Sequence, residues 1–170
     1  MKTVIFCAFL GMLLLSPEAG AKTKTFAQED LTCRTGNDYC RSADGRLLTG
    51  RVMRSEEGNV VIQNYKNGRP SGLTTVLDEQ NRPVRKTYYK EGRKNGIERL
   101  YYENRTIKSS AEYKDGLLNG QVDYYTEKGK RKGRLTYKDG LFDKGYCIVD
   151  GRKMNIDAGK TDELISCGDE

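Results

Sequence analysis

The stretch EYKDGLLNGQVDYY, Glu112–Tyr125, decides the fold, because close copies of its first half recur along the chain. NYKNGRPSG begins at Asn64, YYKEGRKNG at Tyr88 and TYKDGLFDKG at Thr136. Two residue series keep a spacing of 24: the tyrosines Tyr65, Tyr89, Tyr113 and Tyr137, and the glycines Gly68, Gly92, Gly116 and Gly140. A fixed period of this length predicts a stack of small structural units.

Each unit is predicted to contain two strands and two turns. Gln121–Tyr125 is rich in β-forming residues, 126–130 contains a turn glycine, and 132–138 is a second run that ends before Asp139-Gly140. Asp-Gly and Asn-Gly favour tight hairpins because glycine accepts a positive φ at little cost. Strands of about five to six residues are expected. Helix is disfavoured, because glycine interrupts every apolar run.

Neighbouring positions such as Leu100 and Tyr101 are both apolar or aromatic, although they point to opposite faces of a strand. A sheet with one buried face alternates more cleanly. The sequence therefore predicts an all-β fold: an elongated, twisted antiparallel meander of tandem 24-residue β-hairpin repeats, largely single-layered. Eleven tyrosines, four phenylalanines and no tryptophan indicate a thin, tyrosine-rich core.

The first residues have the pattern of a secretory signal peptide. A basic start is followed by an apolar run, 4–15, that is too short to span a bilayer, and then by Ala19-Gly20-Ala21. We interpret residues 1–21 as a signal peptide cleaved near Ala21, which predicts a periplasmic or secreted protein. Cys7 leaves with this peptide.

Four cysteines remain, two on either side of the repeats. Disulfides persist in an oxidising compartment, and three pairings are available to four cysteines. Cys33–Cys40 and Cys147–Cys167 are favoured because each closes a local loop. A zinc site is disfavoured, since no pair has the close C-x2-C spacing. The expected organisation is 22–44 as a lead-in with one Cys pair, 45–145 as repeats, and 146–170 as a C-terminal cap with the other pair.

The composition argues against catalysis. The chain has no histidine, which removes the commonest general base and metal ligand. Acids such as Glu79, Glu103 and Glu127 recur with the repeat, as turn residues do, whereas an active site needs one asymmetric set. We therefore expect no enzyme activity, cofactor, metal or small-molecule substrate. A carboxylate-dependent glycan hydrolase is the weaker alternative.

Aromatic and basic side chains are the expected contact residues. The net charge is +6, and the run KGKRKGR, 128–134, concentrates positive charge. Tyr and Arg are enriched at protein interfaces. Such a run could also hold anionic lipid headgroups, or protect an exposed edge from aggregation. Nucleic acid is not expected outside the cell. The candidate partner-binding residues are Tyr101, Tyr102, Tyr124, Tyr125, Lys130, Arg131 and Lys132.

The units between Tyr88 and Gly140 resemble the MORN-repeat variant family, many of whose bacterial members are named YwqK-type antitoxins. The matching motif is Tyr-Lys-Asp-Gly-x-x-x-Gly followed by an aromatic pair, and the resemblance covers Gly50 to Gly145. Arg105 departs from it by standing where Gly129 stands one unit later. The unit at 73–96 carries Pro83 and lacks the aromatic pair, which predicts an imperfect hairpin there.

The resemblance implies a curved meander of hairpins with a non-catalytic binding role. We therefore expect an exported protein that docks a partner protein, as an immunity or antitoxin protein that neutralises a toxin or effector enzyme. The alternative is a structural or anionic-lipid-binding repeat protein of the cell envelope. Partner identity and oligomeric state are left open, although an exposed sheet edge can pair two copies.

Overall fold

The computed structural model describes residues 25–27, 31–33 and 39–157, and every regular element among them is a β-strand. The predicted signal peptide and Cys167 lie outside these residues. The strands are β1 (Thr25–Ala27), β2 (Leu31–Cys33), β3 (Cys40–Ser42), β4 (Gly50–Glu56), β5 (Asn59–Lys66), β6 (Arg69–Pro70), β7 (Gly72–Leu77), β8 (Pro83–Lys90), β9 (Arg93–Tyr101), β10 (Ile107–Lys114), β11 (Leu117–Tyr125), β12 (Arg131–Lys138), β13 (Leu141–Val149) and β14 (Arg152–Asp157).

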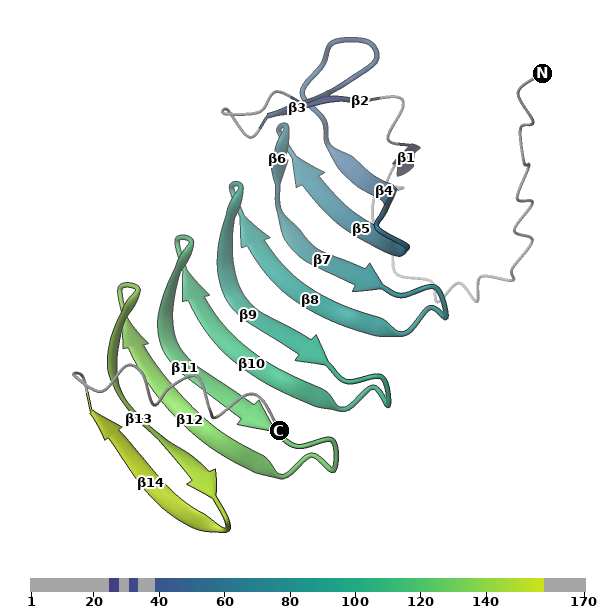
Figure 1. Cartoon of the computed structure of the whole chain (residues 1–170). Helices are drawn as coiled ribbons and strands as arrows, with labels where there is room; N and C mark the ends of the chain where they lie inside the picture. The colour runs from purple at the N-terminus through teal and green to yellow at the C-terminus, as the bar shows by residue number, and fades with distance from the viewer. Residues whose placement is uncertain (1–24, 28–30, 34–38, 158–170) are drawn as a thin grey trace, which may run out of the picture.

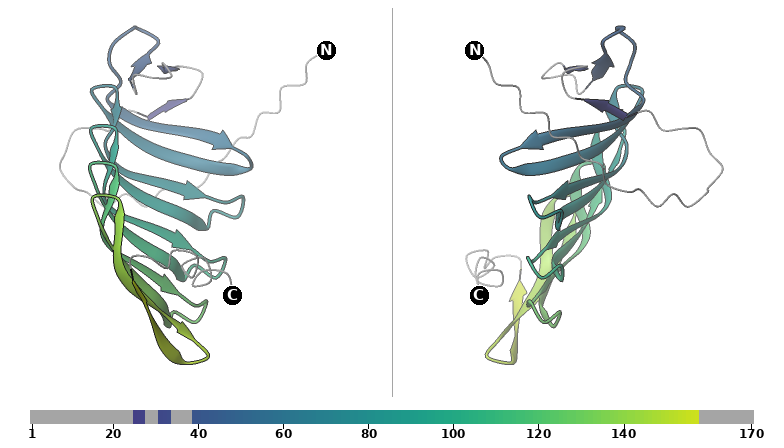
Figure 2. Two further views of the ribbon diagram at one scale, coloured as in Figure 1. Left: turned by 60° about the vertical axis from the view of Figure 1, so that its left-hand side comes forward. Right: turned by 90° about the vertical axis from the view of Figure 1, so that its right-hand side faces the viewer.

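One long sheet contains nearly all of these strands, and each pairs with its neighbours in sequence (Figure 1). Its order is β1-β4-β5-β7-β8-β9-β10-β11-β12-β13-β14, with β6 beside β5, while β2 and β3 form a separate small sheet. Only the β1–β4 pair is parallel among the described strand pairs. The sheet is a twisted, curved layer that does not close on itself (Figure 2). The predicted antiparallel meander of hairpins is confirmed.

The Tyr-Lys-x-Gly motif forms two-residue turns at one end of the strands. In the turn between β10 and β11, φ is +50° at Asp115 and +93° at Gly116, the conformation that favours Asp-Gly and Asn-Gly. The Gly116 N–H also donates a hydrogen bond to the Lys94 carbonyl oxygen of the preceding unit, at 2.8 Å. The same bond recurs from Gly92 to Pro70 and from Gly140 to Leu118. The motif therefore closes each hairpin and also joins it to the previous one.

Three five-residue turns, 78–82, 102–106 and 126–130, lie at the other end of the strands. In each, the first residue donates to the carbonyl of the fifth and accepts from the N–H of the fourth. The fourth residue is left-handed, with φ of +58° at Asn81, +68° at Arg105 and +76° at Gly129. Arg105 thus adopts the conformation of the glycine it replaces. Pro83 begins β8, where a strand tolerates proline. The β7–β8 hairpin has a register shift between Val76 and Leu77, and the β9–β10 and β11–β12 hairpins have one beside their own five-residue turns, so this irregularity does not set the unit apart.

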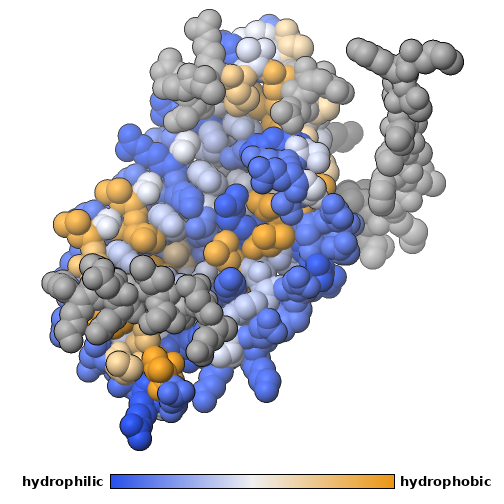
Figure 3. All heavy atoms as spheres, viewed as in Figure 1, coloured by the Kyte–Doolittle hydropathy of each residue, from blue (hydrophilic) through white to orange (hydrophobic). Residues whose placement is uncertain are grey.

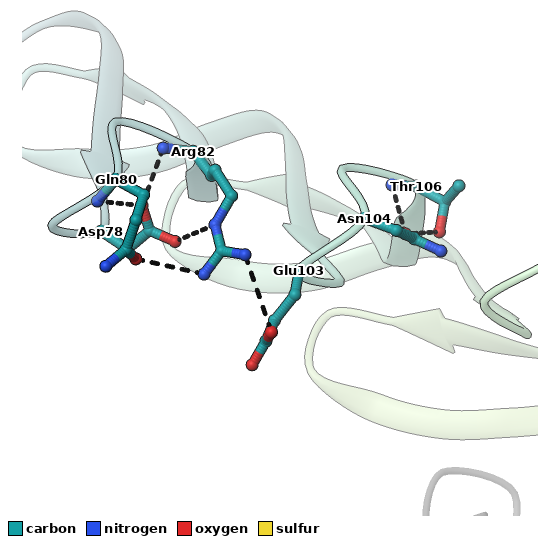
Figure 4. A network of polar contacts seen from close by, with 6 residues as sticks. All are labelled: Asp78, Gln80, Arg82, Glu103, Asn104 and Thr106. Carbon is teal, nitrogen blue, oxygen red and sulfur yellow. Dashed lines mark hydrogen bonds and ion pairs between the residues drawn. The ribbon is translucent and has the colours of Figure 1, made fainter.

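Polar side chains hold these longer turns (Figure 4). The Asp78 carboxylate accepts from the backbone N–H groups of Gln80 and Arg82, and Arg82 Nε donates to it at 2.7 Å. Arg82 also reaches the next turn, where Nη1 lies 3.6 Å from the Glu103 carboxylate. Adjacent turns are therefore connected by side chains as well as by the sheet.

Two rows of side chains cross the sheet on opposite faces, because successive strand residues alternate. One face, called the core face, carries the cross-strand partners Ala111, Val122, Leu135, Gly145 and Ile156. The other face, called the basic face, carries Lys86, Arg99, Ser110, Asp123, Arg134 and Tyr146.

The apolar core is small and lies at the C-terminal end of the core face. Val122, Leu135, Cys147 and Ile156 are buried there. Partly buried residues pack around them: Ala111, Leu118, Tyr124, Tyr137 and Phe142. A second cluster, Cys40, Leu48 and Val52, lies at the N-terminal end with Leu31 and Tyr65. Figure 3 shows apolar side chains in separate patches within a mainly hydrophilic surface, as expected for a thin sheet.

Between the two clusters, Val61 and Val76 are buried, and the other buried positions are polar. Gln63, Thr74 and Thr87 are less than a tenth exposed. The Gln63 side-chain oxygen accepts from Arg54 at 3.0 Å and from the Tyr65 hydroxyl at 3.1 Å. The Gln63 oxygen and the Thr87 hydroxyl, which donates to Glu98, remain hydrogen-bonded, which removes the main cost of burying them.

Glu98 is the charged member of this polar stretch, and its side chain is 12 % exposed. Lys94 Nζ lies 2.8 Å from its carboxylate, and Thr87 Oγ1 donates to it at 2.8 Å. Burial alone would raise the pKa of Glu98, but hydrogen bonds from Lys94 and Thr87 and the charges of Lys94 and Arg85 outweigh it. The pKa of the carboxyl therefore lies below its usual value.

We expect Glu98→Gln to lower the free energy of unfolding at pH 7 by about 1–2 kcal/mol, because Lys94 loses its counter-charge. A depressed folded pKa stabilises the protein fully above the unfolded pKa of about 4.3, and this contribution is lost as pH falls through the folded pKa. The variant should therefore lose less stability than the wild type between pH 5 and pH 3. Urea unfolding at pH 7, 5 and 3 measures both effects.

The control is Glu103→Gln, since the Glu103 side chain is 90 % exposed. Its free energy of unfolding should stay within about 0.5 kcal/mol of the wild type. A Glu98→Gln variant as sensitive to acid as the wild type would contradict the assignment.

The Cys33–Cys40 disulfide is confirmed, with 4.2 Å between the two Cα atoms. Such a bond is consistent with an oxidising, exported compartment. The small β2–β3 sheet that it joins is attached to the repeats, because the Cys40 N–H donates to the Gly68 carbonyl and the Gly68 N–H to the Leu48 carbonyl, each at 2.7 Å. Cys147 is also disulfide-bonded. Its predicted partner, Cys167, is outside the described residues.

Candidate functional site

The predicted contact tyrosines do not share one surface. Tyr124 packs against the apolar cluster of the core face. Tyr101 and Tyr125 lie on the basic face, where Lys86 Nζ is 5.8 Å from the ring centre of Tyr101. Tyr102 is in the turn after β9, and its hydroxyl donates to the Tyr125 carbonyl at 2.8 Å. Of the four, only Tyr101 and Tyr125 therefore share a face of the sheet.

Of the three predicted cations, Lys130 is the last residue of the five-residue turn 126–130, and Arg131 and Lys132 begin β12. Lys130 and Arg131 are exposed, while Lys132 is half-buried. Arg131 pairs in register with Tyr125, and its guanidinium carbon lies 5.9 Å from the centre of that ring. The structure therefore brings Arg131 and Tyr125 together, whereas Lys130 stays in the turn at the end of the strands.

Asp123 is the centre of this part of the basic face. Its carboxylate is 13 % exposed and accepts two hydrogen bonds from Arg134, at 2.6 and 2.9 Å. Arg131 Nε lies 3.3 Å from the same carboxylate. One negative charge thus holds two guanidinium groups, so the group carries net positive charge and fixed geometry.

Tyr146 extends the group to the next strand. It pairs in register with Arg134, and Lys153 Nζ lies 4.4 Å from its ring centre. Interactions with the Tyr146 and Tyr125 side chains and the charge of Asp123 raise the pKa of Arg131. A shallow depression of about 380 Å³ lies beside Tyr146, lined also by Arg134, Thr136, Lys144, Lys153 and Asn155. We call Asp123, Tyr125, Arg131, Arg134 and Tyr146 the Tyr/Arg group.

Sequence reasoning missed Asp123, Arg134 and Tyr146. Centring the hairpin on the turn 126–130 pairs Tyr125 with Arg131 and would pair Asp123 with Gly133. The register shift between Tyr124 and Tyr125 places Asp123 opposite Arg134 instead, so the sequence did not reveal that ion pair. Tyr146 was outside the repeat register, and nothing in the sequence marks it.

Two further hollows lie near the N-terminal end, and both include Tyr39 and Leu47. Their volumes are about 610 and 590 Å³. The Arg69 guanidinium stacks 4.4 Å from the centre of the Tyr39 ring, and the Leu47 side chain is exposed. This second aromatic and basic surface lies beside the turn at Asn67-Gly68.

Within residues 25–27, 31–33 and 39–157, no group of His, Cys, Asp or Glu side chains could hold a metal ion. The same residues contain no helix long and apolar enough to cross a membrane.

No protein-family model matches the chain, and no curated protein matches its sequence. Among solved structures, it is similar to accessory secretory proteins 1, 2 and 3 of Streptococcus pneumoniae, with 16 % identity and a TM-score of 0.34 over 78 % of this chain and 22 % of that chain. Two structures of TarM, one of them an S. aureus mutant in complex with fondaparinux, α-GlcNAc-glycerol and UDP, match over 74 % of this chain at 11 % identity, with TM-scores of 0.20 and 0.21. The chain spans about a fifth of the length of these structures. A likeness at this level identifies neither family nor activity.

Proposed function

We propose that this chain is a non-catalytic, exported binding protein that docks an acidic surface of a partner protein on its basic face. The observation that carries the proposal is the Tyr/Arg group, in which one carboxylate positions two guanidinium groups between two tyrosines. The resemblance of the repeat units to the MORN-repeat variant family supports a role of the chain as an immunity or antitoxin protein that neutralises a toxin or effector enzyme.

A rigid surface is what such a role needs. Binding loses affinity when side chains must be ordered, and here Arg131 and Arg134 are already held by Asp123. Planar guanidinium groups suit bidentate contacts with carboxylates, and tyrosine rings add contact area at low entropic cost. An acidic patch around the active site of an enzyme would match both the guanidinium groups and the tyrosine rings.

A photo-crosslinking experiment tests the docking face. A photoreactive phenylalanine analogue replaces Tyr146 on the basic face or, as the control, Tyr137 in the core-face cluster. We expect a discrete protein adduct from position 146 in cells that export the protein, and little or none from position 137. Adducts of equal yield at both positions would contradict the proposal.

With the captured protein in hand, Arg131→Glu should raise the Kd by about tenfold or more, which is ~1.4 kcal/mol. The control is Lys138→Glu, because the Lys138 side chain is 73 % exposed and lies beside the turn Asp139-Gly140. Its Kd should remain within about twofold. An unchanged Kd for Arg131→Glu would exclude the Tyr/Arg group as the contact.

An anionic envelope surface is the second candidate, favoured by the exposed cations Lys128 and Lys130 beside the basic face. Sedimentation with vesicles of anionic lipid tests it. Replacement of Lys130, Arg131 and Lys132 by glutamine should abolish sedimentation if lipid is the ligand, and about 0.5 M salt should do the same.

A further inference from the structure

The last strand of the sheet, β14, has an open edge. It pairs with β13, and no described strand lies on its other side. All of its side chains are exposed except that of Ile156. At the opposite end of the sheet the edge strand is the short β1, whose three residues pair with Arg51, Val52 and Met53 of β4. Unpaired strand edges expose backbone donors and acceptors that can bind another strand.

The turn that precedes β14 fixes which backbone groups face outward. Asp150-Gly151 is a two-residue turn, which makes Val149 and Arg152 its closing hydrogen-bonded pair. Hydrogen-bonding groups alternate along an antiparallel strand. Those of Arg152, Met154 and Ile156 therefore point toward β13, and those of Lys153, Asn155 and Asp157 point outward.

We propose that β14 pairs in antiparallel orientation with β14 of a second copy of the chain, about a two-fold axis at Asn155. In this register Lys153 of each copy faces Asp157 of the other, and Met154 faces Ile156. The two Asn155 side chains face each other at the axis. Every cross-strand pair is then of matched chemistry: opposite charges, two apolar side chains, or two amides.

Neighbouring registers lack this match. Outward-pointing residues must pair with outward-pointing residues, so the strand can shift only in steps that keep that parity. An axis at Met154 would place Lys153 against Asn155 and Arg152 against Ile156. An axis at Ile156 would place Asn155 against Asp157 and leave Lys153 outside the described strand pair. The register about Asn155 is the one that pairs the charges.

The charged groups nearby leave this pairing available. Lys144 of β13 pairs in register with Asp157 of β14, but no ion pair joins the two side chains within 4.0 Å. Lys153 is exposed, and its Nζ lies 4.4 Å from the centre of the Tyr146 ring on β13, a contact that is weak at an exposed site. A lone lysine discourages edge pairing with most strands. In the proposed pair, each Lys153 meets the Asp157 carboxylate on β14 of the other copy.

Such a dimer has a consequence for binding. The two-fold axis of an antiparallel strand pair runs perpendicular to the sheet, so the same face of each copy lies on the same side. Two basic faces would form one continuous surface. The inference does not depend on the proposed function, because pairing is measured without any partner.

Sedimentation equilibrium of the exported protein, with its disulfides formed, tests the pairing. We expect the wild type to be a dimer at micromolar concentration, and Lys153→Asp and Asp157→Lys each to be monomers because like charges then meet. The double variant K153D/D157K should be a dimer again. Far-UV circular dichroism and the Tm show that each variant is folded.

A monomeric wild type would overturn the proposal, and would leave this edge to a strand of different sequence or to the chain's own last residues. A wild-type dimer that both single variants retain would also overturn it, since another surface would then join the copies. Failure of the double variant to dimerise would exclude the register about Asn155.

Discussion

Leu135→Ala is expected to lower the free energy of unfolding by about 2–4 kcal/mol, the usual range for truncating a fully buried leucine. The Leu135 side chain is 2 % exposed and packs with Val122, Cys147 and Ile156. Most of the effect comes from the cavity left behind, because backbone hydrogen bonds on both sides hold β12 in place and limit collapse. Chemical denaturation measures it directly.

The loss matters more here than in a thicker domain. A protein is stable by roughly 5–15 kcal/mol in total, and this sheet has one small apolar cluster at its C-terminal end. Hairpins in a repeat protein stabilise their neighbours, so loss of the cluster should loosen β12–β14 before the rest. Hydrogen exchange should show early loss of protection in these strands.

Leu141→Ala is the matched control, because the Leu141 side chain is 76 % exposed at a tight turn. It should change the free energy of unfolding by no more than about 0.5 kcal/mol. Equal destabilisation by the two leucine variants would mean that the cluster is not the core of this end of the sheet.

The sequence was sufficient to predict the meander, because the residues that form the turns can be recognised in it. Asp115-Gly116 and its counterparts need left-handed residues, and the repeat supplies them at a constant spacing. Strand lengths were underestimated at five to six residues, whereas the repeat strands have six to nine. Each 24-residue unit has one two-residue and one five-residue turn, which leaves 17 residues to two strands, as in β10 with eight and β11 with nine.

The candidate site was only partly predictable. Tyr124 and Tyr125 are adjacent in the sequence, and alternation alone separates them to opposite faces. Which face each occupies depends on bulges such as the register shift between Tyr124 and Tyr125, which periodicity does not reveal. The polar stretch around Glu98 was also missed, because a buried acid looks like a surface residue until its partners are known.

Gly145 shows how a repeat pattern can be misread. It follows one residue after the position that Gly72, Gly96 and Gly120 occupy, and those three have φ of +85°, +108° and +126°. Gly96 and Gly120 lie in bulges after the tight turns. Gly145 is not among the glycines with positive φ; it lies opposite Leu135 in the core-face row. It therefore serves packing, not turn geometry.

Gly145→Ala is expected to lower the free energy of unfolding by about 2–3 kcal/mol through overpacking. A Cβ atom at this position would lie 2.6 Å from both the Arg134 carbonyl oxygen and Leu135 Cδ2. The oxygen belongs to the neighbouring strand, so relief requires movement of the backbone. Gly129→Ala is the contrasting variant: a Cβ there meets no atom within 4 Å, and only the left-handed conformation costs it about 1–2 kcal/mol.

The double variant Leu135→Ala/Gly145→Ala separates the two sources of strain at Gly145. Removing Leu135 Cδ2 frees one of the two close contacts and leaves the other at the Arg134 carbonyl. The double variant should therefore be less destabilised than the sum of the single variants, by about 0.5–1.5 kcal/mol in a double-mutant cycle. Strict additivity would mean that the new methyl group never meets Leu135, and the core-face row of cross-strand partners would then be wrong at this strand pair.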